Sequence, residues 1–410
     1  MTAQNLHMIN ALSHYQGQMA PIEHTDLPEC EYRIRNIGWT LGNDCPYRCQ
    51  HCYSMSARIK GRDMEKWMVD RIVQQLAENE IETVNLGGNE PLFTNGLNPR
   101  DSLLPYIIEQ LVEKGILVGL TTAGITLTYL EKHAPQTVAL LNDIDVSLDS
   151  PYAEEHNRNR GTNLYGLALA ALEIAQRRAI PHTIIMCGMA WNFTSRHLHE
   201  LVELARRFEA HVRINPIKPV ESGQVSVELS ASQYFEGFRT LSDLCDAVDV
   251  GEPPLSAVFR LPEAKGCPCG RSSFRIHSIT PTGEIPVSPC VYLHEYKFGN
   301  LLTDDLADIV RSAPFQSFRR RNANPDAVEG CSGCSMLQAC RGGCAARSYL
   351  TKLHHERQRT LFGRDPYCPR DQVVEMAPAA LRLHVPNSRL VHQDYLCTWI
   401  GKPRVGELPS

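Results

Sequence analysis

The segment Leu41-Gly-Asn-Asp-Cys45-Pro-Tyr-Arg-Cys49-Gln-His-Cys52-Tyr53 places three cysteines in a C-x3-C-x2-C spacing directly after an apolar run. Thiolates this close in sequence can bind three corners of one [4Fe-4S] cube, which leaves the fourth iron without a protein ligand. An open coordination position on a metal is where a substrate or cosubstrate binds. A zinc site, completed by His51 or by a distant cysteine, is the alternative interpretation of the same spacing.

The other cysteines strengthen the case for metal binding. The chain has 15 cysteines among 410 residues, and they are clustered rather than evenly spread. In a reducing compartment such clusters indicate metal ligands and not a disulfide framework. The N-terminus shows no secretory signal, and no stretch reaches the roughly 18 apolar residues that a membrane span needs. We therefore expect a cytoplasmic protein without a membrane partner.

The charge gives no sign of a nucleic-acid partner. The formal net charge is −5, whereas proteins that bind nucleic acid usually carry a basic patch. One short basic run, Arg319 to Arg321, is present. We expect it on a solvent-exposed helix face, where such runs usually lie.

Residues 36–220 alternate between short apolar runs and amphipathic helical patterns. One helical stripe is formed by Met64, Met68, Ile72 and Leu76, and another by Leu198, Leu201, Val202, Ala205 and Phe208. The candidate strands are Asn36–Gly42, Glu82–Gly87, Leu117–Thr122, Asp143–Leu148, His182–Cys187 and Val212–Pro216. Six strand–helix units predict an α/β fold with a parallel sheet and helices on its outer face. Six units can close only partly, so we expect a partial (β/α)6 TIM-like barrel with its chemistry at the carboxyl ends of the strands.

The pattern divides the chain into five parts. Residues 1–35 form an N-terminal extension, and residues 36–220 form the partial barrel. Residues 221–265 form a connector with one predicted helix, Gln233–Val248. Residues 266–370 have short strands, dense turns and eight cysteines, and residues 371–410 form a tail without a strong period that we expect to pack on the body.

The first cysteine segment resembles the signature of the radical S-adenosylmethionine (SAM) superfamily, including the aromatic Tyr53 after the last cysteine. The superfamily fold is a partial (β/α)6 barrel, in agreement with the six units counted above. The resemblance implies that Cys45, Cys49 and Cys52 hold a [4Fe-4S] cluster, and that the open iron binds the amino and carboxylate groups of SAM.

A glycine-rich segment follows the second predicted strand and reads Gly87-Gly88-Asn89-Glu90-Pro91. It resembles the superfamily's Gly-Gly-Glu-Pro motif with one inserted residue, and the resemblance implies a contact with the SAM amino group. Glycines let the backbone approach a ligand, and Glu90 can accept a hydrogen bond from an ammonium group. The insertion leaves open whether Glu90 or a backbone carbonyl makes the contact, and a simple turn is the alternative.

A third segment, Ser147-Leu-Asp149, ends the fourth predicted strand and is followed by Arg160-Gly161. It resembles the superfamily's Ser-x-Asp motif. By that likeness Ser147 and Arg160 bind the SAM carboxylate, for which a guanidinium fork is well suited. Arg158 is a competitor for the same role, and a helix cap or a turn would also explain Ser147 and Asp149.

The cysteines from Cys331 to Cys344 read C-x2-C-x5-C-x3-C and resemble the signature of the SPASM domain, which carries auxiliary iron–sulfur clusters. The resemblance implies that Cys269 (or Cys267), Cys290 and Cys344 hold a first auxiliary cluster. A second would be held by Cys331, Cys334, Cys340 and Cys368. A zinc ribbon is the alternative, and the close spacing of Cys267 and Cys269 leaves open whether both are ligands.

Four cysteines lie outside these sets: Cys30, Cys187, Cys245 and Cys397. Cys187 ends the fifth predicted strand, so it is a candidate donor of a hydrogen atom to a substrate radical. A buried cysteine that merely packs in the core is the alternative.

These features together predict an oxidoreductase that cleaves SAM to a 5′-deoxyadenosyl radical and abstracts hydrogen from a substrate. An external electron donor such as a flavodoxin or ferredoxin is expected. The first hypothesis is a maturase that oxidises or cross-links a peptide or protein side chain. The alternatives are a dehydrogenase or epimerase of a small molecule such as an aminoglycoside-like sugar, and a non-catalytic metal-binding scaffold. Only 44 residues precede Cys45, too few for a complete leader-peptide recognition domain. This weakens the peptide hypothesis without removing it, because a separate protein can recognise the leader.

Overall fold

The computed structural model describes residues 23–42, 44–54, 62–261, 265–371 and 381–405. Residues 1–22 of the predicted N-terminal extension and residues 372–380 of the predicted tail lie outside them. Within the described residues one ten-stranded sheet has the order β7-β10-β6-β5-β4-β3-β2-β1-β8-β9.

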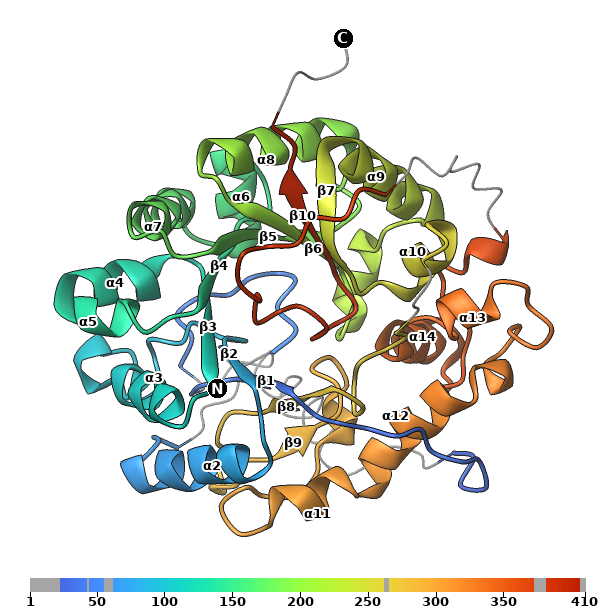
Figure 1. The fold of residues 1–410 in the computed structure, drawn as a ribbon, viewed down its shortest axis with the longest axis horizontal. Coiled ribbons are helices and arrows are strands. Elements are labelled where there is room, and N and C mark those ends of the chain that lie inside the picture. The colour runs from blue at the N-terminus through green and yellow to red at the C-terminus, as the bar shows by residue number, and fades with distance from the viewer. Residues whose placement is uncertain (1–22, 43, 55–61, 262–264, 372–380, 406–410) are drawn as a thin grey trace, which may run out of the picture.

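The six predicted strands form the centre of this sheet. They are β1 (Asn36–Trp39), β2 (Thr83–Leu86), β3 (Leu117–Thr122), β4 (Asp143–Ser147), β5 (His182–Gly188) and β6 (His211–Pro216). Each is parallel to the next in chain order. The sheet curves without closing, as Figure 1 shows, so the predicted partial barrel is confirmed.

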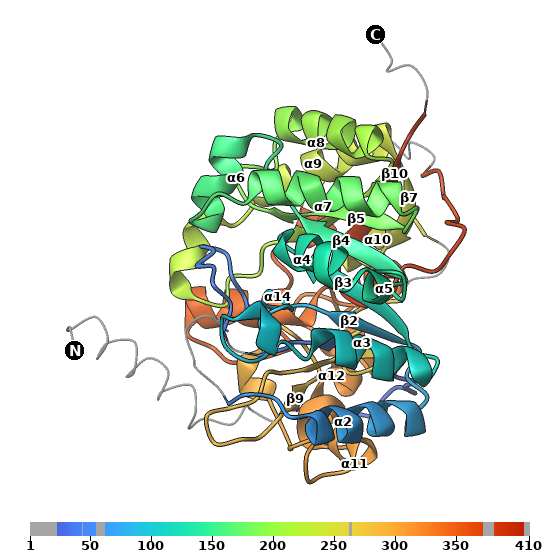
Figure 2. The same ribbon diagram turned by 90° about the vertical axis from the view of Figure 1, so that its left-hand side faces the viewer.

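Helices cover the outer face of the strands (Figures 1 and 2). They are α2 (Lys66–Glu78), α3 (Leu104–Glu113), α4 (Ile125–His133), α5 (Pro135–Val138), α6 (Ala153–Arg160), α7 (Tyr165–Arg177) and α8 (Ser195–Arg207). Both predicted apolar stripes are confirmed. Ile72 in α2 and Leu201 in α8 are fully buried against the sheet, and burying each such side chain contributes about 1.5–3 kcal/mol.

The predicted connector contains more regular structure than expected. It holds α9 (Ala231–Leu244), β7 (Cys245–Val250) and α10 (Pro253–Val258). The predicted helix Gln233–Val248 was therefore wrong in its last four residues, which belong to β7. These residues form a strand because they pair with β10, in which Pro403 lies opposite Cys245. The partner is far along the chain, so no local pattern in the sequence reveals it.

The last described residues insert into the sheet. β10 (Trp399–Pro403) pairs antiparallel with both β6 and β7. In Figure 1 the segment leading to β10 runs across the inside of the curved sheet. A strand of five residues is too short to give a strong period, which explains why the sequence showed none here.

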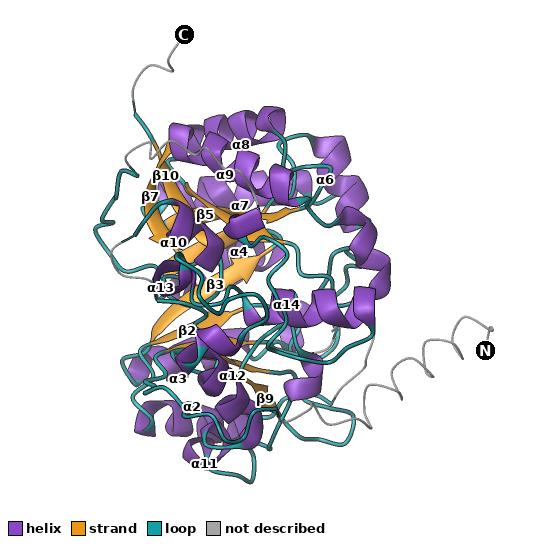
Figure 3. Ribbon diagram, turned by 90° about the vertical axis from the view of Figure 1, so that its right-hand side faces the viewer, coloured by secondary structure: helices purple, strands orange, loops and turns teal. Residues whose placement is uncertain are grey.

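The cysteine-rich part continues the other end of the sheet. β8 (Ser273–Ile276) is parallel to β1, and β9 (Val287–Ser288) is antiparallel to β8. Four helices follow, and Figure 3 shows them beside the strands: α11 (Leu306–Val310), α12 (Ala313–Ala323), α13 (Leu337–Cys340) and α14 (Ala345–Thr351). Strands β7 to β10 extend the barrel sheet, so one continuous sheet runs across the predicted connector, cysteine-rich part and tail. The sheet therefore gives no boundary between these parts, and the predicted domain boundaries stay predictions. No helix in the described ranges is long and apolar enough to cross a membrane.

The basic run lies in α12, and its expected exposure was wrong. Arg319 and Arg321 are each only 1% exposed. The Arg321 guanidinium donates to the carbonyl oxygens of Leu361 at 2.6 Å and of Gly342 at 2.5 Å. Burying an arginine is favourable only when its donors are hydrogen-bonded. These two hydrogen bonds satisfy donors of Arg321 and connect the backbone at Leu361 with the backbone at Gly342, within the cysteine-rich part.

Candidate active site and cluster sites

A cavity lies at the carboxyl ends of β2 to β6, with about 1110 Å³ of empty space including its open mouth. Most of the predicted SAM-site residues line it: Cys45, Cys49, Cys52, Tyr53, Gly88, Glu90, Ser147 and Arg160. Cys187 lines it as well. Gly87 is not among the lining residues, and its carbonyl oxygen instead accepts a hydrogen bond from Arg275 Nη2 at 2.8 Å. The individual roles stay predictions, but the fold brings these side chains into one cavity.

The loop that carries the first three cysteines is anchored on both sides. The Asn89 amide donates to the carbonyl oxygens of Leu41 and Gly42, the latter at 3.1 Å. Gln224 donates to the carbonyl oxygen of Gln50 at 3.1 Å. The inserted Asn89 therefore holds the start of the cysteine loop against the glycine-rich segment.

The donor chemistry in this cavity fits an iron–sulfur cluster with one open iron. Cys45, Cys49 and Cys52 all face the cavity, and three thiolates are the set that leaves one iron of a cube free. The zinc alternative with His51 as fourth ligand is disfavoured, because both His51 ring nitrogens already have partners, whereas a distant cysteine as fourth ligand stays open. One His51 nitrogen is 3.0 Å from the Asn159 amide nitrogen, and the other is 3.7 Å from Asp149.

Arg160, at the end of α6, is fixed by a fully buried carboxylate. Its Nε donates to Asp149 Oδ2 at 2.7 Å, and its Nη1 lies 3.8 Å from Cys49 Sγ. Burial by itself raises the pKa of Asp149, but Arg160, His51 and His156 together hold that pKa below its usual range. Asp149 therefore stays ionised. The competitor Arg158 is exposed and does not line the cavity.

Glu90 is buried and its carboxylate already has several protein donors. Thr122 and Thr126 hydroxyls bind it, and so do the backbone amides of Ala123 at 2.9 Å and Thr126 at 3.2 Å. Burial raises the pKa of Glu90 in spite of these donors. The carboxylate thus binds the residues at the start of α4, and whether it or a neighbouring backbone carbonyl accepts from a ligand ammonium stays a prediction.

Cys187 and Tyr53 lie on other parts of the cavity wall. The Cys187 amide donates to Asp149 Oδ1 at 3.3 Å. Burial raises the pKa of the Cys187 thiol well above its usual value, so the thiol keeps its hydrogen at neutral pH. The Tyr53 ring packs against Tyr292, with 5.2 Å between ring centroids.

The sequence analysis missed several lining residues with polar heads, among them Arg213, Lys218, Arg275, His392 and Tyr395. Arg213 could have been found, because a charged residue inside an otherwise apolar parallel strand usually has a specific partner. That partner is Asp145 on β4, 3.0 Å from Arg213 Nη1. His392 and Tyr395 come from the tail, where no local signal marked them.

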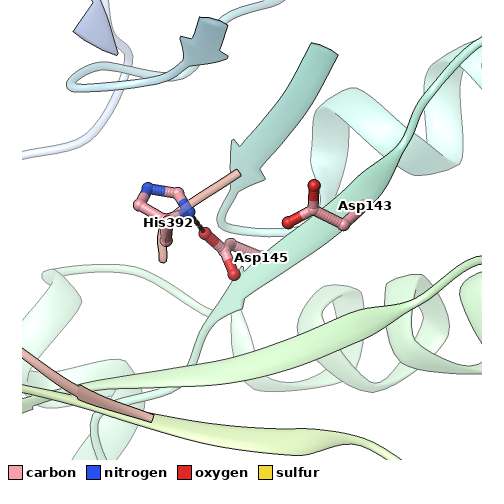
Figure 4. Close-up of side chains that lie close together, drawn as sticks. All are labelled: Asp143, Asp145 and His392. Atoms are coloured by element: carbon pink, nitrogen blue, oxygen red, sulfur yellow. Dashed lines mark ion pairs between the residues drawn. The ribbon is translucent and has the colours of Figure 1, made fainter. Parts of the chain in front are cut away.

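Asp143, Asp145 and His392 form a compact buried group, with one candidate ligand atom from each within 4.8 Å of the others. Figure 4 shows His392 joined to Asp145 and both aspartates on one strand. Their oxygens already have partners: Asp143 Oδ1 accepts from the Asn142 amide at 2.7 Å and from the Val391 amide at 3.1 Å, and Asp145 pairs with Arg213. A divalent cation would have to displace this arginine, so the group is an anchor for the tail and a poor cation site.

The cysteine-rich part has two groups of thiols. Cys331, Cys334, Cys340 and Cys368 act on one another electrostatically, as the predicted second auxiliary set requires. The cysteines predicted for the first set are buried and contiguous, and the alternatives Cys267 and Cys269 lie in the same cluster, so which of them is a ligand stays open here. Interactions between thiols join Cys267 to Cys269 and Cys344, and join Cys269 to Cys290. Each group offers at least the four thiolates that a [4Fe-4S] cluster uses.

Comparison with known families bears on the fold and on the class of cofactor, and leaves the individual ligand assignments as predictions. The model of the radical SAM superfamily matches residues 39–205, and that of the iron–sulfur cluster-binding SPASM domain matches residues 267–335. The chain is 26% identical to the mycofactocin maturase MftC of Mycobacterium ulcerans over 383 residues, covering 90% of this chain and 94% of the relative. It is 25% identical to that of Mycolicibacterium smegmatis over 358 residues, covering 84% and 83%.

Two solved structures resemble the fold. One is native anSMEcpe with bound AdoMet, with a TM-score of 0.57, 17% identity and coverage of 81% of this chain and 94% of the other. The second is Streptococcus suis SuiB bound to its precursor peptide SuiA, with a TM-score of 0.61, 14% identity and coverage of 81% and 75%. At such identities the likeness concerns the fold alone.

Proposed function

The chain belongs to the radical SAM superfamily and carries a SPASM domain, and on this premise we propose that it is a maturase that oxidatively modifies a peptide. The similarity to mycofactocin maturases runs along 90% of this chain and so includes both the barrel and the cysteine-rich part. The enzyme uses SAM and [4Fe-4S] clusters. The small-molecule alternative, an aminoglycoside-like sugar, has no comparable full-length relative among those described above.

One structural observation carries the proposal. The cavity that contains the Cys45, Cys49 and Cys52 thiols also contains Lys218. The Lys218 ammonium donates to the carbonyl oxygen of Cys397 at 3.4 Å, and Cys397 lies in the same buried cluster of side chains as the first auxiliary thiols. A substrate in this cavity would thus lie between the site of hydrogen abstraction and a site that can accept an electron.

Reductive cleavage of SAM supplies a 5′-deoxyadenosyl radical, which removes a hydrogen atom from the substrate. The residues of the chain bind and orient the reactants. Arg160, held by Asp149, lines the cavity and is proposed to bind the SAM carboxylate, together with Ser147, which lines the same cavity. We propose that a backbone carbonyl oxygen of Gly88 or Asn89 binds the SAM ammonium group, because that of Glu90 already accepts from the Phe93 amide.

An external donor has to reduce the clusters, and we propose a flavodoxin or ferredoxin for this role. We also propose a cytoplasmic setting, since the many thiols that serve as cluster ligands need a reducing compartment.

The test is a turnover assay with a peptide encoded by a short open reading frame adjacent to the gene. Anaerobically reconstituted, reduced protein is incubated with SAM and this peptide, and 5′-deoxyadenosine and the peptide mass are followed. We expect peptide-dependent 5′-deoxyadenosine and a loss of hydrogen mass from the peptide, both abolished in Cys49→Ala. An unchanged peptide together with an oxidised or epimerised aminoglycoside would overturn the proposal in favour of the small-molecule enzyme. If no SAM is cleaved at all, the chain is a metal-binding scaffold.

A further inference from the structure

Five buried cysteines, and not four, meet in the core of the cysteine-rich part. Cys267, Cys269, Cys290, Cys344 and Cys397 belong to one contiguous buried cluster of side chains, and each is at most 5% exposed. The first four lie in or beside the SPASM segment, but Cys397 comes from the tail, two residues before β10 begins. Its place among these thiols is a product of the tertiary fold.

Specific interactions connect Cys397 to its neighbours. Its thiol interacts with those of Cys267 and Cys344. The Cys269 thiol interacts with those of Cys267 and Cys290. Cys267 therefore lies in the middle, with Cys269 and Cys290 on one side and with Cys344 and Cys397 on the other.

The group contains five thiols, one more than a four-iron cube needs. A fully ligated [4Fe-4S] cluster takes four thiolates around a central body. The two outer pairs supply four thiolates, and the Cys267 thiol interacts with one member of the first pair and with both members of the second. We propose that Cys397 is an iron ligand of the first auxiliary cluster, together with Cys269, Cys290 and Cys344, and that Cys267 is the spare thiol.

The backbone around Cys397 is held in place independently of any cluster. Its carbonyl oxygen accepts from Lys218 Nζ at 3.4 Å. Two residues earlier, the carbonyl oxygen of Tyr395 accepts from the Ser273 hydroxyl at 2.7 Å, and Ser273 is bridged to Cys269. These contacts hold the tail next to Cys269, a proposed ligand of the same cluster. Hydrogen bonds around the ligands position them for metal binding.

Ligation by Cys397 has a consequence for the active site. Tyr395 and Leu396 line the cavity that also contains the first three cysteines. An auxiliary cluster bound to the next residue would fix this part of the wall, so loading of the cluster and the shape of the substrate cavity are coupled through the tail.

The inference rests on the cofactor assignment and not on the peptide substrate, and its test needs no turnover. The full-length chain with Cys45, Cys49 and Cys52 all changed to Ala retains only the auxiliary sites. Reconstituted anaerobically, it should bind about eight irons from two cubes. Adding Cys397→Ala should lower the iron content by about half, or keep it and change the electron paramagnetic resonance spectrum of one cluster because Cys267 has replaced the missing ligand. Adding Cys267→Ala instead should change neither.

Controls separate ligation from packing. Cys245→Ala removes an equally buried thiol from β7, which pairs with the tail strand, and it should leave iron content and spectrum unchanged. Cys397→Ser keeps the side-chain volume, so if the alanine variant fails to fold, the serine variant shows whether the spectrum depends on this ligand. Iron content and spectra that stay unchanged in both Cys397 variants, with iron lost in Cys267→Ala, would overturn the proposal and make Cys267 the ligand.

Discussion

Arg160 Nε donates to Asp149 Oδ2 at 2.7 Å, while another nitrogen of the same guanidinium lies 3.8 Å from the Cys49 thiol. The arginine thus bridges a permanently charged, buried carboxylate and the first cysteine loop. Its orientation is set before any ligand arrives, which is how a binding group avoids losing affinity to side-chain entropy.

Replacing Arg160 should weaken SAM binding more than any change at its neighbour Arg158. Hydrogen bonds to charged groups contribute about 1.5–3 kcal/mol, so Arg160→Gln should weaken binding about ten- to a hundredfold. Arg160→Lys should recover part of this loss because it keeps the charge without the fork. Equilibrium binding of SAM to the reconstituted protein measures the effect. Arg158→Gln is the matched control, and equal losses in the two glutamine variants would show that Arg160 has no special role.

Gly88→Ala should destabilise the glycine-rich segment. Gly88 has a φ of 94°, and an added Cβ would lie 1.7 Å from Arg275 Nη2, which is held by Thr40 and Gly87. Gly96 has a φ of 70° with nothing within 4 Å of its added Cβ. Gly96→Ala should therefore cost only the backbone strain, about 1 kcal/mol, and Gly88→Ala about 1–3 kcal/mol more. Chemical denaturation measures both, and equal losses would mean that Arg275 moves aside freely.

If Cys187 donates a hydrogen atom to the substrate radical, product formed in D2O should carry deuterium. Its raised pKa keeps the thiol neutral, and a neutral thiol exchanges its hydrogen with D2O. A reaction in D2O should place deuterium in part of the product, and Cys187→Ala should abolish this label. The labelled fraction should not vary between about pH 6 and 9, whereas an ordinary thiol would ionise near about 8.5. Product without deuterium in the unmodified enzyme would assign Cys187 to packing alone.

Stability should fall as the solution becomes mildly acidic. Burial lowers the pKa of His156, His211 and His392 to about 4 each. The unfolded chain binds these protons near about pH 6.5, so between this pH and about 4 the unfolded state binds more protons and is favoured. From pH 6.5 to 5.5 each such histidine should cost up to about 1.4 kcal/mol.

Denaturation at several pH values checks this dependence. His392→Gln should flatten the curve of unfolding free energy against pH by the share of one histidine. His199→Gln should leave the slope unchanged, because His199 is exposed on α8. A stability that is the same at pH 5.5 and 7.5 would contradict the burial argument.

Local patterns in the sequence were sufficient for the barrel and for much of the candidate site. Six apolar runs predicted β1 to β6, and the spacing of Cys45, Cys49 and Cys52 predicted a site at the end of the first strand. The burial of Arg319 and the strand at Cys245 were missed, because charge and helical period describe neighbours along the chain and not what packs against them.

Residues a few positions apart set the period of each element and the clustering of the first cysteine ligands, so both could be predicted before the fold was known. The fold, in contrast, places Arg160 and not Arg158 at the cavity, inserts the tail into the sheet as β10 and brings Cys397 to the auxiliary thiols. These contacts join residues that are distant along the chain: Lys218 and Cys397 are 179 residues apart, and Arg275 and Thr40 are 235 apart. Contacts of this kind form only when a complete core has packed, and no local pattern encodes them.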